Sequence, residues 1–315
     1  MITVICPTYN EENYIGNVLE FFVNAMPREK ELLVIDGGSN DSTREIVKKW
    51  SDLYENIHLL ENPDKYVPYA LNIGIRSSNG DPVIRLDAHA EYSNDYFEKI
   101  LEAFKLTNAD VVGGPVNTIG KSSFQKAVAY AICTVFGIGN SKMHQTEYRG
   151  ELDHVFPGAW NRKLFDEVGL FDERLVRNQD DEFHYRVRSF GKKVYQSPDI
   201  KLIYYPRDKV ISLIKQYFQY GLFKPIVLRK ITSETKLRHL IPLLFALYIL
   251  FSALSFVSIF YLIPLFVYIL IDLYFALKAK TNIKVFVYTI FVYPIIHLSY
   301  GLGFLLGLLK LGADK

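Results

Sequence analysis

Four groups of polar residues follow four short apolar runs near the N-terminus, and their side chains suit a charged, hydroxyl-rich ligand. The groups are Pro7 to Glu12, Asp36 to Asp41, Asn62 to Lys65 and Asp87 to His89. Acids and amides together indicate a ligand with hydroxyl groups, a base with an amide edge and a metal-bound diphosphate. Neither GxGxxG nor GxxxxGK(S/T) occurs there, which argues against dinucleotide and P-loop sites.

Asp87 and His89 lie two positions apart, directly after the apolar run from Val83 to Leu86. Side chains two apart on an extended segment point the same way, so the carboxylate and the imidazole could bind one cation together. Oxygen donors suit Mg²⁺ or Mn²⁺, and one nitrogen ligand favours Mn²⁺ modestly. The alternative for this tripeptide is a structural role in a turn.

A second acidic group, from Asn178 to Glu182, precedes a helical pattern from Phe183 to Phe190. The helix dipole favours acids at a helix N-terminus, which is the structural explanation for this group. A carboxylate at this position is also well placed to act as a general base.

The elements that must position these residues alternate between apolar strands and helical patterns. Strands are expected at residues 2–6, 32–35, 57–60, 83–86 and 111–112, and helices at 14–24, 42–54 and 69–77. This alternation predicts an α/β fold with a Rossmann-like, mostly parallel sheet that is covered by helices on both faces. In such sheets ligands bind outside the carboxyl ends of the strands, where the polar groups lie.

Charge is distributed unevenly along the 315 residues, half of which are hydrophobic, a composition that excludes a disordered chain. Residues 1–200 hold 22 basic and 30 acidic residues, a balance of −8, whereas residues 201–239 hold nine basic and two acidic residues, a balance of +7. From residue 240 onward almost all charge disappears. An acidic head, a basic neck and an apolar tail are typical of a protein seated on an anionic membrane surface. The acidic head would repel nucleic acid, so we expect no nucleic-acid partner.

We expect three parts: a catalytic or binding domain over residues 1–205, a basic amphipathic neck over residues 206–239, and a membrane region over residues 240–309. Residues 240–277 carry one charge, and residues 285–309 carry none. Because a span needs about 20 apolar residues, we predict three transmembrane helices. They lie at about 240–258, 262–277 and 285–309.

Basic residues flank the predicted spans and indicate their orientation. They are Arg229, Lys230, Lys236 and Arg238 before the first span, and Lys278, Lys280 and Lys284 between the second and the third. The positive-inside rule places both groups in the cytoplasm, together with the head of a multi-pass cell-membrane protein. No signal-peptide pattern precedes the first strand, which agrees with this orientation. The alternative is a soluble protein with a very apolar, buried bundle of C-terminal helices.

Four motifs, in this order, resemble those of a known family. They are PTYNEE at residues 7–12, DGGSNDST at 36–43, DAH at 87–89 and NQDDEFHYR at 178–186. The set resembles glycosyltransferase family 2, the inverting enzymes with a GT-A fold. RLDAHAEY at 85–92, the segment 155–186 and QYFQYG at 216–221 are closer to the succinoglycan-biosynthesis type of membrane glycosyltransferase. The resemblance covers residues 2–221.

The resemblance implies a role for individual residues. Asp180 would be the general base, and Asp87 and His89 would bind the metal, Mn²⁺ or Mg²⁺. Asp36 would read the uracil edge, and Asp41 would support its turn. The residues implied in nucleotide-sugar binding are Pro7, Tyr9, Glu11, Asp36, Asp41, Lys65 and Asp87.

Several positions depart from the family's pattern. His89 replaces the second aspartate of the common DxD, and Gln179 replaces the glutamate before the base. Leu71 stands where many members have arginine, which leaves Lys65 or a basic residue of the neck as the expected diphosphate contact.

Acceptor contacts are less clearly marked. Asp181 adjoins Asp180 and stays open as an alternative base or an acceptor contact. Trp160 could stack on a sugar face, although a single tryptophan more often packs in a core. Gln216, Tyr217 and Tyr220 resemble a shortened form of the QxxRW element of processive family members.

The resemblance as a whole implies a metal-dependent inverting hexosyltransferase anchored in a membrane. It would move a hexose from a UDP-sugar to a lipid-linked (polyprenyl diphosphate) saccharide in cell-surface polysaccharide or glycolipid assembly. One alternative is a polyprenyl-phosphate sugar synthase, and a more distant one is a membrane protein that binds nucleotide sugars without turnover. The donor sugar, the acceptor linkage and the choice between Mn²⁺ and Mg²⁺ stay open.

Overall fold

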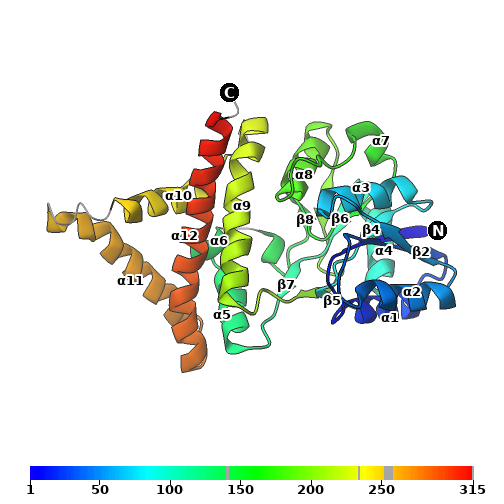
Figure 1. Cartoon of the computed structure of the whole chain (residues 1–315), viewed down its shortest axis with the longest axis horizontal. Coiled ribbons are helices and arrows are strands. Elements are labelled where there is room, and N and C mark those ends of the chain that lie inside the picture. The colour runs from blue at the N-terminus through cyan, green and yellow to red at the C-terminus, as the bar shows by residue number, and fades with distance from the viewer. Residues whose placement is uncertain (140–141, 233–234, 252–257, 314–315) are drawn as a thin grey trace. The chain divides into compact units, whose positions relative to one another are not determined.

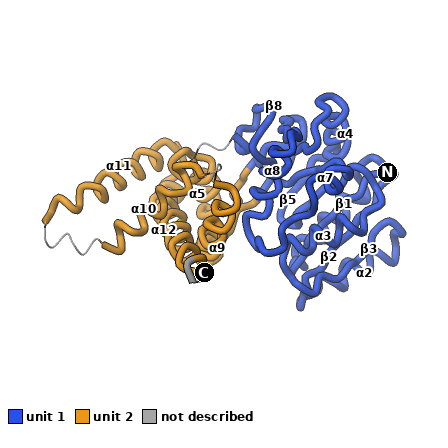
Figure 2. Tube along the Cα trace, turned by 90° about the horizontal axis from the view of Figure 1, so that it is seen from above, with its two compact units in different colours: residues 1–117, 142–204 blue, residues 118–141, 205–315 orange. Residues whose placement is uncertain are grey.

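The computed structural model describes residues 1–139, 142–232, 235–251 and 258–313 (Figure 1). The chain forms two compact units, which Figure 2 shows in different colours. Unit 1 comprises residues 1–117 and 142–204, and unit 2 comprises residues 118–141 and 205–315. A unit boundary therefore lies next to residue 205, where a boundary was expected, but residues 118–141 interrupt the expected domain 1–205.

Unit 1 is built on a mixed eight-stranded sheet with the order β3-β2-β1-β4-β9-β6-β10-β8. Its strands are β1 (Ile2–Thr8), β2 (Lys30–Asp36), β3 (Ile57–Glu61), β4 (Val83–Arg85), β6 (Val111–Gly113), β8 (Gly150–Glu151), β9 (Ala159–Trp160) and β10 (Val194–Gln196). The strands β1 to β4 pair in parallel, whereas β9 runs antiparallel between β4 and β6. This confirms the expected α/β fold class.

Side chains of the central strands alternate between two hydrophobic cores, one on each face of the sheet. Val4 and Leu32 pack with α1 and α4, whereas Ile5 and Leu33 pack with α3 and α8. Strand side chains alternate with a period of two, so a strand buried on both faces is apolar at every position. The helices are α1 (Ile15–Asn24), α2 (Thr43–Leu53), α3 (Val67–Ser77), α4 (Tyr96–Thr107), α7 (Leu164–Val168) and α8 (Gln179–Ser189).

A second, three-stranded sheet follows the central strand β4 along the chain. It has the order β5-β11-β7, with β5 at Ala90–Tyr92, β7 at Val116–Thr118 and β11 at Leu202–Tyr204. The backbone N–H of Asp87 donates a hydrogen bond to the Tyr92 hydroxyl at 2.7 Å. The small sheet therefore fixes the segment that carries Asp87 and His89. A short 3-10 turn, η1 (Lys142–His144), also belongs to unit 1.

Unit 2 is helical and draws on two separate stretches of the chain. Its helices are α5 (Ser123–Ile132), α6 (Val135–Ile138), α9 (Val210–Lys230), α10 (Leu237–Leu250), η4 (Ile259–Leu262), α11 (Ile263–Lys278) and α12 (Ile283–Ala313). The Phe124 ring of α5 packs edge-on against Tyr288 of α12, with 5.8 Å between the ring centroids. His297 Nε2 lies 2.8 Å from the Phe136 carbonyl oxygen. Residues 118–141 belong to unit 2 because α5 and α6 bury their apolar side chains against α12.

The helices α9 and α12 pack with their backbones unusually close. A Cβ atom on Gly221 would lie 2.0 Å from the Tyr300 carbonyl oxygen, and one on Gly303 would lie 2.1 Å from the Phe218 carbonyl oxygen. Glycine lets two helices approach in this way because it has no side chain. Tyr217 of α9 packs against the core of unit 2.

The described residues contain two helices that are long and apolar enough to cross a membrane, 259–278 and 283–311. Of the first predicted span, 240–258, the structure describes residues 240–251 and 258. Residues 240–250 belong to α10, a helix of 14 residues. Residues 252–257 lie outside the described residues. The structure therefore describes two helices of spanning length where three were predicted.

Gly221→Ala should destabilise unit 2, because the new methyl group would meet the backbone of α12. We expect the free energy of unfolding to fall by about 1–3 kcal/mol, as for other overpacked contacts. A lower thermal midpoint of the full chain in detergent would show this loss. Gly16→Ala in α1 is the matched control, since nothing lies within 4 Å of its added Cβ. An unchanged midpoint for Gly221→Ala would contradict the close packing of α9 and α12.

Candidate active site

The ends of three parallel strands bring the expected polar groups to one edge of the main sheet. Thr8 pairs with Asp36 at the ends of β1 and β2, and Ile5 pairs with Arg85 at the end of β4. The loops that follow contact one another: the Asn10 amide N–H donates to Ser39 Oγ at 2.9 Å. The residues before and after these strand ends thus form one continuous site.

Asp36 is buried and shapes the loop that follows β2. Its Oδ2 accepts hydrogen bonds from the amide N–H groups of Gly38 at 2.9 Å and Ser39 at 3.0 Å. Arg44 also lies 3.4 Å from the same oxygen. These contacts hold the Asp36 carboxylate in the turn. Its Oδ1 accepts a hydrogen bond from the Ser39 hydroxyl. A carboxylate oxygen can accept a second hydrogen bond, so the contact of Asp36 with a uracil edge stays a prediction.

Asp41 and Lys65 lie beside this turn, where nucleotide-binding residues were expected. Asp41 accepts hydrogen bonds from the Thr43 amide at 3.0 Å and the Glu12 amide at 3.2 Å, and so connects the second loop with the first. A Cβ on Gly37 would lie 3.0 Å from the Lys65 carbonyl oxygen. The backbone of Lys65 therefore lies against the Gly37 turn, and its side chain is exposed.

Three further positions have surroundings that differ from one another. Two of them were predicted to bind the nucleotide sugar, and the third departs from the family's pattern. Tyr9 is 48% exposed at the start of the first loop, and Pro7 is half-buried on β1. Leu71 is fully buried in the core. The position where many family members have arginine thus serves packing in this chain.

Glu11, His89 and Tyr14 form a small cluster next to Asp87. His89 Nδ1 lies 3.1 Å from Glu11 Oε1, and the Tyr14 ring lies 4.6 Å from the imidazole, between centroids. Glu11 Oε2 is buried and has no hydrogen-bond partner among the described residues. A buried carboxylate oxygen without a partner is costly, so this oxygen is available to a ligand.

Arg85 joins the two carboxylates to which the sequence gave separate roles. Its Nε donates to Asp87 Oδ1 at 2.7 Å, and its Nη1 lies 3.3 Å from both carboxylate oxygens of Asp180. The guanidinium also lies over the Phe156 ring, 4.8 Å from the centroid. Arg85 is 6% exposed. Arg85 was not predicted as a site residue. Its place inside the apolar run Val83–Leu86 is nevertheless a signal in the sequence, because a charge in a buried strand needs a partner.

Asp180 is held at the first turn of α8 by contacts further along the helix. Glu182 of α8 is buried and pairs with Arg186 at 2.8 Å. Arg186 also donates to the carbonyl oxygens of Val168 and Leu170. The helix is thereby fixed to the loop after α7. Of the two adjacent aspartates, Asp180 is the one that shares Arg85 with Asp87.

Burial controls the protonation of this part of the site. Burial raises the pKa of the Asp180 carboxyl, Arg85 opposes that rise, and the negative charges of Asp87 and Asp181 add to it. His184, one turn further along α8, lies with its Nδ1 2.8 Å from the Asp180 carbonyl oxygen. Burial first, and then His154, lower the pKa of His184 to about 3. His184 is therefore neutral at physiological pH.

Trp160 lies in the core of unit 1, and the neck residues predicted to contact the acceptor lie in unit 2. Trp160 is fully buried and packs edge-on against Phe165, Phe171 and Phe183. This is the core-packing role that sequence analysis gave as its alternative to sugar stacking. The neck residues Gln216, Tyr217 and Tyr220 lie on α9 in unit 2, where Gln216 Nε2 donates to the Tyr220 hydroxyl at 3.2 Å.

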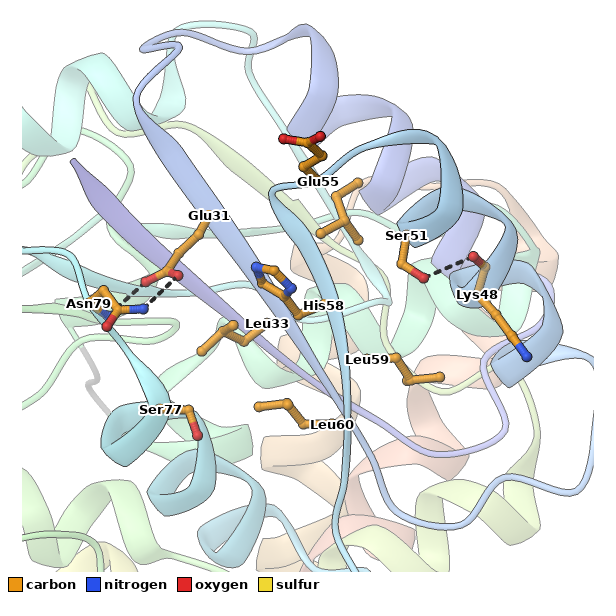
Figure 3. Close-up of a pocket in the computed structure, with 11 residues that line it drawn as sticks. Glu31, Leu33, Lys48, Ser51, Glu55, His58, Leu59, Leu60, Ser77 and Asn79 are labelled. Atoms are coloured by element: carbon orange, nitrogen blue, oxygen red, sulfur yellow. Dashed lines mark hydrogen bonds between the residues drawn. The ribbon is translucent and has the colours of Figure 1, made fainter.

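A hollow of about 590 Å³ lies elsewhere in unit 1, over β2 and β3 (Figure 3). Glu31 and His58 line it, and Glu31 accepts hydrogen bonds from Asn79, which also lines it. Glu31 is near the amino end of β2, whereas Asp36 ends the same strand. The hollow is therefore separate from the strand-end site.

The donor set near Asp87 fits a divalent cation that a diphosphate helps to hold. Among the described residues, no group of three His, Cys, Asp or Glu side chains is close enough to hold a metal alone. In phosphate sites, however, one or two carboxylates commonly bind Mg²⁺, and the substrate's phosphates complete the coordination. Asp87, His89 and the unpaired oxygen of Glu11 supply donors of the appropriate kind.

Comparisons with known proteins place the chain among glycosyltransferases. Residues 3–169 match the family described as "Glycosyl transferase family 2". The "Succinoglycan biosynthesis protein ExoA" of Rhizobium meliloti is 32% identical over 244 residues, which are 76% of this chain and 74% of that protein.

Two further comparisons also find similarity to glycosyltransferases. A Methanococcus voltae protein is 32% identical over 239 residues, 73% of this chain and 74% of its own. Its name is "Dolichyl N-acetyl-alpha-D-glucosaminyl phosphate 3-beta-D-2,3-diacetamido-2,3-dideoxy-beta-D-glucuronosyltransferase". Among solved structures, a mannosyltransferase from Pyrobaculum calidifontis in complex with GDP-Man and Mn²⁺ has a TM-score of 0.57 at 18% identity, over 75% of this chain and 65% of that one. This last likeness shows the fold.

Arg85→Gln should destabilise unit 1 more at pH 7.5 than at pH 5.5. The change leaves Asp87 and Asp180, which are both partly buried, without their cation. Breaking a fully buried ion pair costs about 3–5 kcal/mol, which is the upper bound for the loss of unfolding free energy here. The pKa of Asp180 is already raised and would rise further, so protonation relieves part of the cost as the pH falls. Thermal unfolding of the full chain at the two pH values measures the difference.

Arg149→Gln is the control for this prediction. Arg149 pairs with Asp199 at 2.7 Å, but both side chains are about half exposed, so the loss should be small at both pH values. An equal loss at both pH values for Arg85→Gln would contradict the assignment of Asp180 as the residue that is left charged.

Proposed function

The chain belongs to glycosyltransferase family 2, and on that premise we propose that it moves a hexose from a UDP-sugar to a lipid-linked saccharide at a membrane, with inversion. Homologues in this family act on polysaccharides or lipid-linked sugars, as the names of the two relatives state. The chain is a glycosyltransferase; the donor, the acceptor, the metal and the membrane attachment are the proposed parts.

The observation that carries the proposal is the ion-paired group of Asp87, Arg85 and Asp180. Inverting transfer needs a base on the acceptor side of the sugar and stabilisation of charge on the diphosphate side. The Arg85 guanidinium holds two carboxylates at a fixed separation. Asp180 is suited to the first task, and Asp87, as a proposed metal ligand, to the second. A protein that only bound nucleotide sugars would have no use for a partly buried base beside the diphosphate site.

Asp180 would remove the proton from the acceptor hydroxyl while that oxygen attacks the anomeric carbon. The bond from the sugar to the diphosphate breaks on the opposite face, so a single displacement inverts that carbon. Arg85 opposes the rise that burial causes in the pKa of Asp180, which favours the ionised carboxylate, and its Nη1 contacts both carboxylate oxygens.

The nucleoside diphosphate would lie across the loops after β1, β2 and β3. Asp36 and Asp41 hold these loops in shape, and Asp36 is also the proposed contact of the uracil edge. Lys65, exposed beside this turn, is the proposed diphosphate contact, and Pro7, Tyr9 and Glu11 form the first-strand side.

A divalent cation, Mn²⁺ or Mg²⁺, would be held by Asp87 and His89, with Glu11 at hand, and would neutralise charge that develops on the departing diphosphate. Arg85 is engaged by two carboxylates, so the site carries little positive charge of its own to offer. This balance supports metal dependence.

Two observations support a lipid-linked acceptor: the helices that follow the catalytic unit along the chain, and the name of one relative. Two apolar helices of spanning length follow the catalytic unit, and one relative acts, by its name, on a dolichyl-linked sugar phosphate. A polyprenyl-phosphate sugar synthase is the second candidate, in which the lipid phosphate itself would be the acceptor.

The assay uses the full chain in native membranes, whose own lipids serve as acceptors. Radiolabelled UDP-glucose, UDP-galactose, UDP-N-acetylglucosamine and GDP-mannose are supplied one at a time, and the lipid product is identified by mass spectrometry. With the best donor, Asp180→Asn should lower turnover by about 10² or more, because a positioned base is lost. UDP affinity should stay within about threefold.

Asp181→Asn is the matched control for Asp180→Asn and should keep most of the turnover. If Asp181→Asn loses turnover and Asp180→Asn keeps it, the base is the other aspartate. A labelled product in which the sugar is attached directly to a lipid phosphate would support the synthase instead.

Excess EDTA should abolish transfer, and added Mn²⁺ or Mg²⁺ should restore it, because the diphosphate then regains its counter-ion. His89→Ala should raise the metal concentration needed for half-maximal rate while it leaves the thermal midpoint nearly unchanged, since His89 is partly exposed. Full activity in EDTA would remove the metal from the proposal.

A further inference from the structure

The register of α9 against α12 shows that these two helices run side by side in the same direction. Leu213 of α9 packs in one cluster with Val285 and Val292, near the start of α12. Further along, the Leu222 carbonyl oxygen lies against Gly307. Figure 1 shows α9 alongside α12. Whatever position α12 takes relative to a membrane, α9 therefore takes it too.

The composition of α9 is unsuited to the interior of a bilayer. The helix has 21 residues, but it is not among the described helices that are long and apolar enough to span. Lys215 is exposed, and Gln216 and Gln219 follow it near the middle of the helix. Charged and amide side chains at the centre of a membrane are costly and rare. A perpendicular α12 would take this polar stretch of α9 into the hydrocarbon.

The helices α11 and α12 differ in how much of their apolar surface the protein covers. Half of the most apolar window of α12 is buried inside unit 2, whereas only 11% of that of α11 is buried. Exposed apolar side chains of α11 include Phe266, Leu270 and Tyr274. By its contacts α12 is a core helix of unit 2. The protein leaves most of the apolar window of α11 uncovered, although Tyr268 and Phe275 of α11 contact α12.

The basic residues give an independent indication. Lys284 precedes the stretch of α12 beside α9, whereas Arg229 and Lys230 end α9 beyond Gly307. At about 1.5 Å per residue, the 23 residues from Lys284 to Gly307 span about 35 Å, more than the roughly 30 Å of a bilayer core. A spanning α12 would therefore put these two basic groups on opposite faces. Cytoplasmic segments carry an excess of Lys and Arg, so one shared face is favoured.

We propose that α12 lies along the membrane surface beside α9, and that the hairpin formed by α10 and α11 is the part that enters the bilayer and returns through the same face. All seven basic residues at the helix ends then face the anionic headgroups on one side. They are Arg229, Lys230, Lys236, Arg238, Lys278, Lys280 and Lys284. The exposed apolar side chains of α12, such as Phe291 and Leu302, are in contact with the outer part of the acyl layer.

This inference rests on the proposed membrane attachment and is independent of the proposed chemistry. It replaces the three predicted spans by a hairpin with both ends on the side of the catalytic unit. The two arrangements differ in one measurable respect: the two ends of α12 lie on one face of the membrane or on opposite faces.

The test places single cysteines in the full chain, at Lys284→Cys and Lys310→Cys at the ends of α12, with Leu53→Cys on unit 1 as the reference. Exposed Cys133 is replaced by serine, and buried Cys6 is kept. A membrane-impermeant maleimide is applied to sealed inverted and right-side-out vesicles, and labelling in detergent confirms that each thiol reacts. We expect all three cysteines to be labelled in inverted vesicles only.

Labelling of Lys284→Cys and Lys310→Cys from opposite sides would overturn the proposal, as would protection of either from both sides. Depth is measured separately, with a bimane on Leu302→Cys or Val267→Cys and with lipids that carry spin labels at the headgroup or deep in the acyl chain. The deep label should quench the Val267 probe more strongly, and the headgroup label the Leu302 probe. Equal depth would contradict the surface position of α12.

Carbonate extraction tests whether the chain is inserted in the membrane, separately from where α12 lies. Release of the whole chain from membranes would contradict both the hairpin and the proposed attachment. Retention together with opposite-sided labelling would contradict the position of α12 alone and leave the proposed function in place.

Discussion

The buried guanidinium of Arg85 is the interaction on which the candidate site depends. Removing three charged groups from water is costly, and their mutual attraction repays that cost only when geometry and hydrogen bonding are good. Arg85 meets this requirement with a short bond to Asp87, bonds to both oxygens of Asp180, and the Phe156 ring below its plane. Because arginine stays charged, its guanidinium is a permanent cation between the two carboxylates.

This group also connects two parts of unit 1 that the chain builds separately. Arg85 ends β4, in the parallel part of the sheet, whereas Asp180 begins α8, almost a hundred residues later. The sheet changes from parallel to antiparallel pairing between these parts, at β9. The contact across this change of direction brings nucleotide-binding loops on one side close to a base on the other. A site of this kind needs both halves to be folded.

Patterns in the sequence predict the parts of unit 1 that repeat a simple rule. Strands buried on both faces are mostly apolar, so the apolar runs of β1 and β2 predict these strands within two residues at each end. The run of β3, at the edge of the sheet, predicts that strand equally well. The grouping of polar residues at strand ends follows from the parallel arrangement. Asp36 was harder to interpret, because an acid that holds its own turn and an acid that binds a base have the same sequence pattern.

Other features depend on which partner a segment meets, and a sequence pattern does not identify partners. The apolar face of α5 indicates that it packs against something, but its partner, α12, begins about 150 residues later. Hydropathy likewise measured the length of α12 and could not show that half of it is covered by protein. Arg85 was the exception that the sequence did mark, by a charge within an apolar run.

The interrupted course of unit 2 affects the order in which the protein can fold during synthesis. The helices α5 and α6 leave the ribosome with an apolar face that includes Phe124, Val128 and Ile132. Their partner α12 follows about 150 residues later, a delay of about 8–30 s at typical rates of translation. Unit 1 can close in the meantime, but this apolar face must wait, and during that interval it is exposed to chaperones and to the membrane. Cutting the chain after residue 204 would make that exposure permanent, so the catalytic unit is not a fragment that truncation can release.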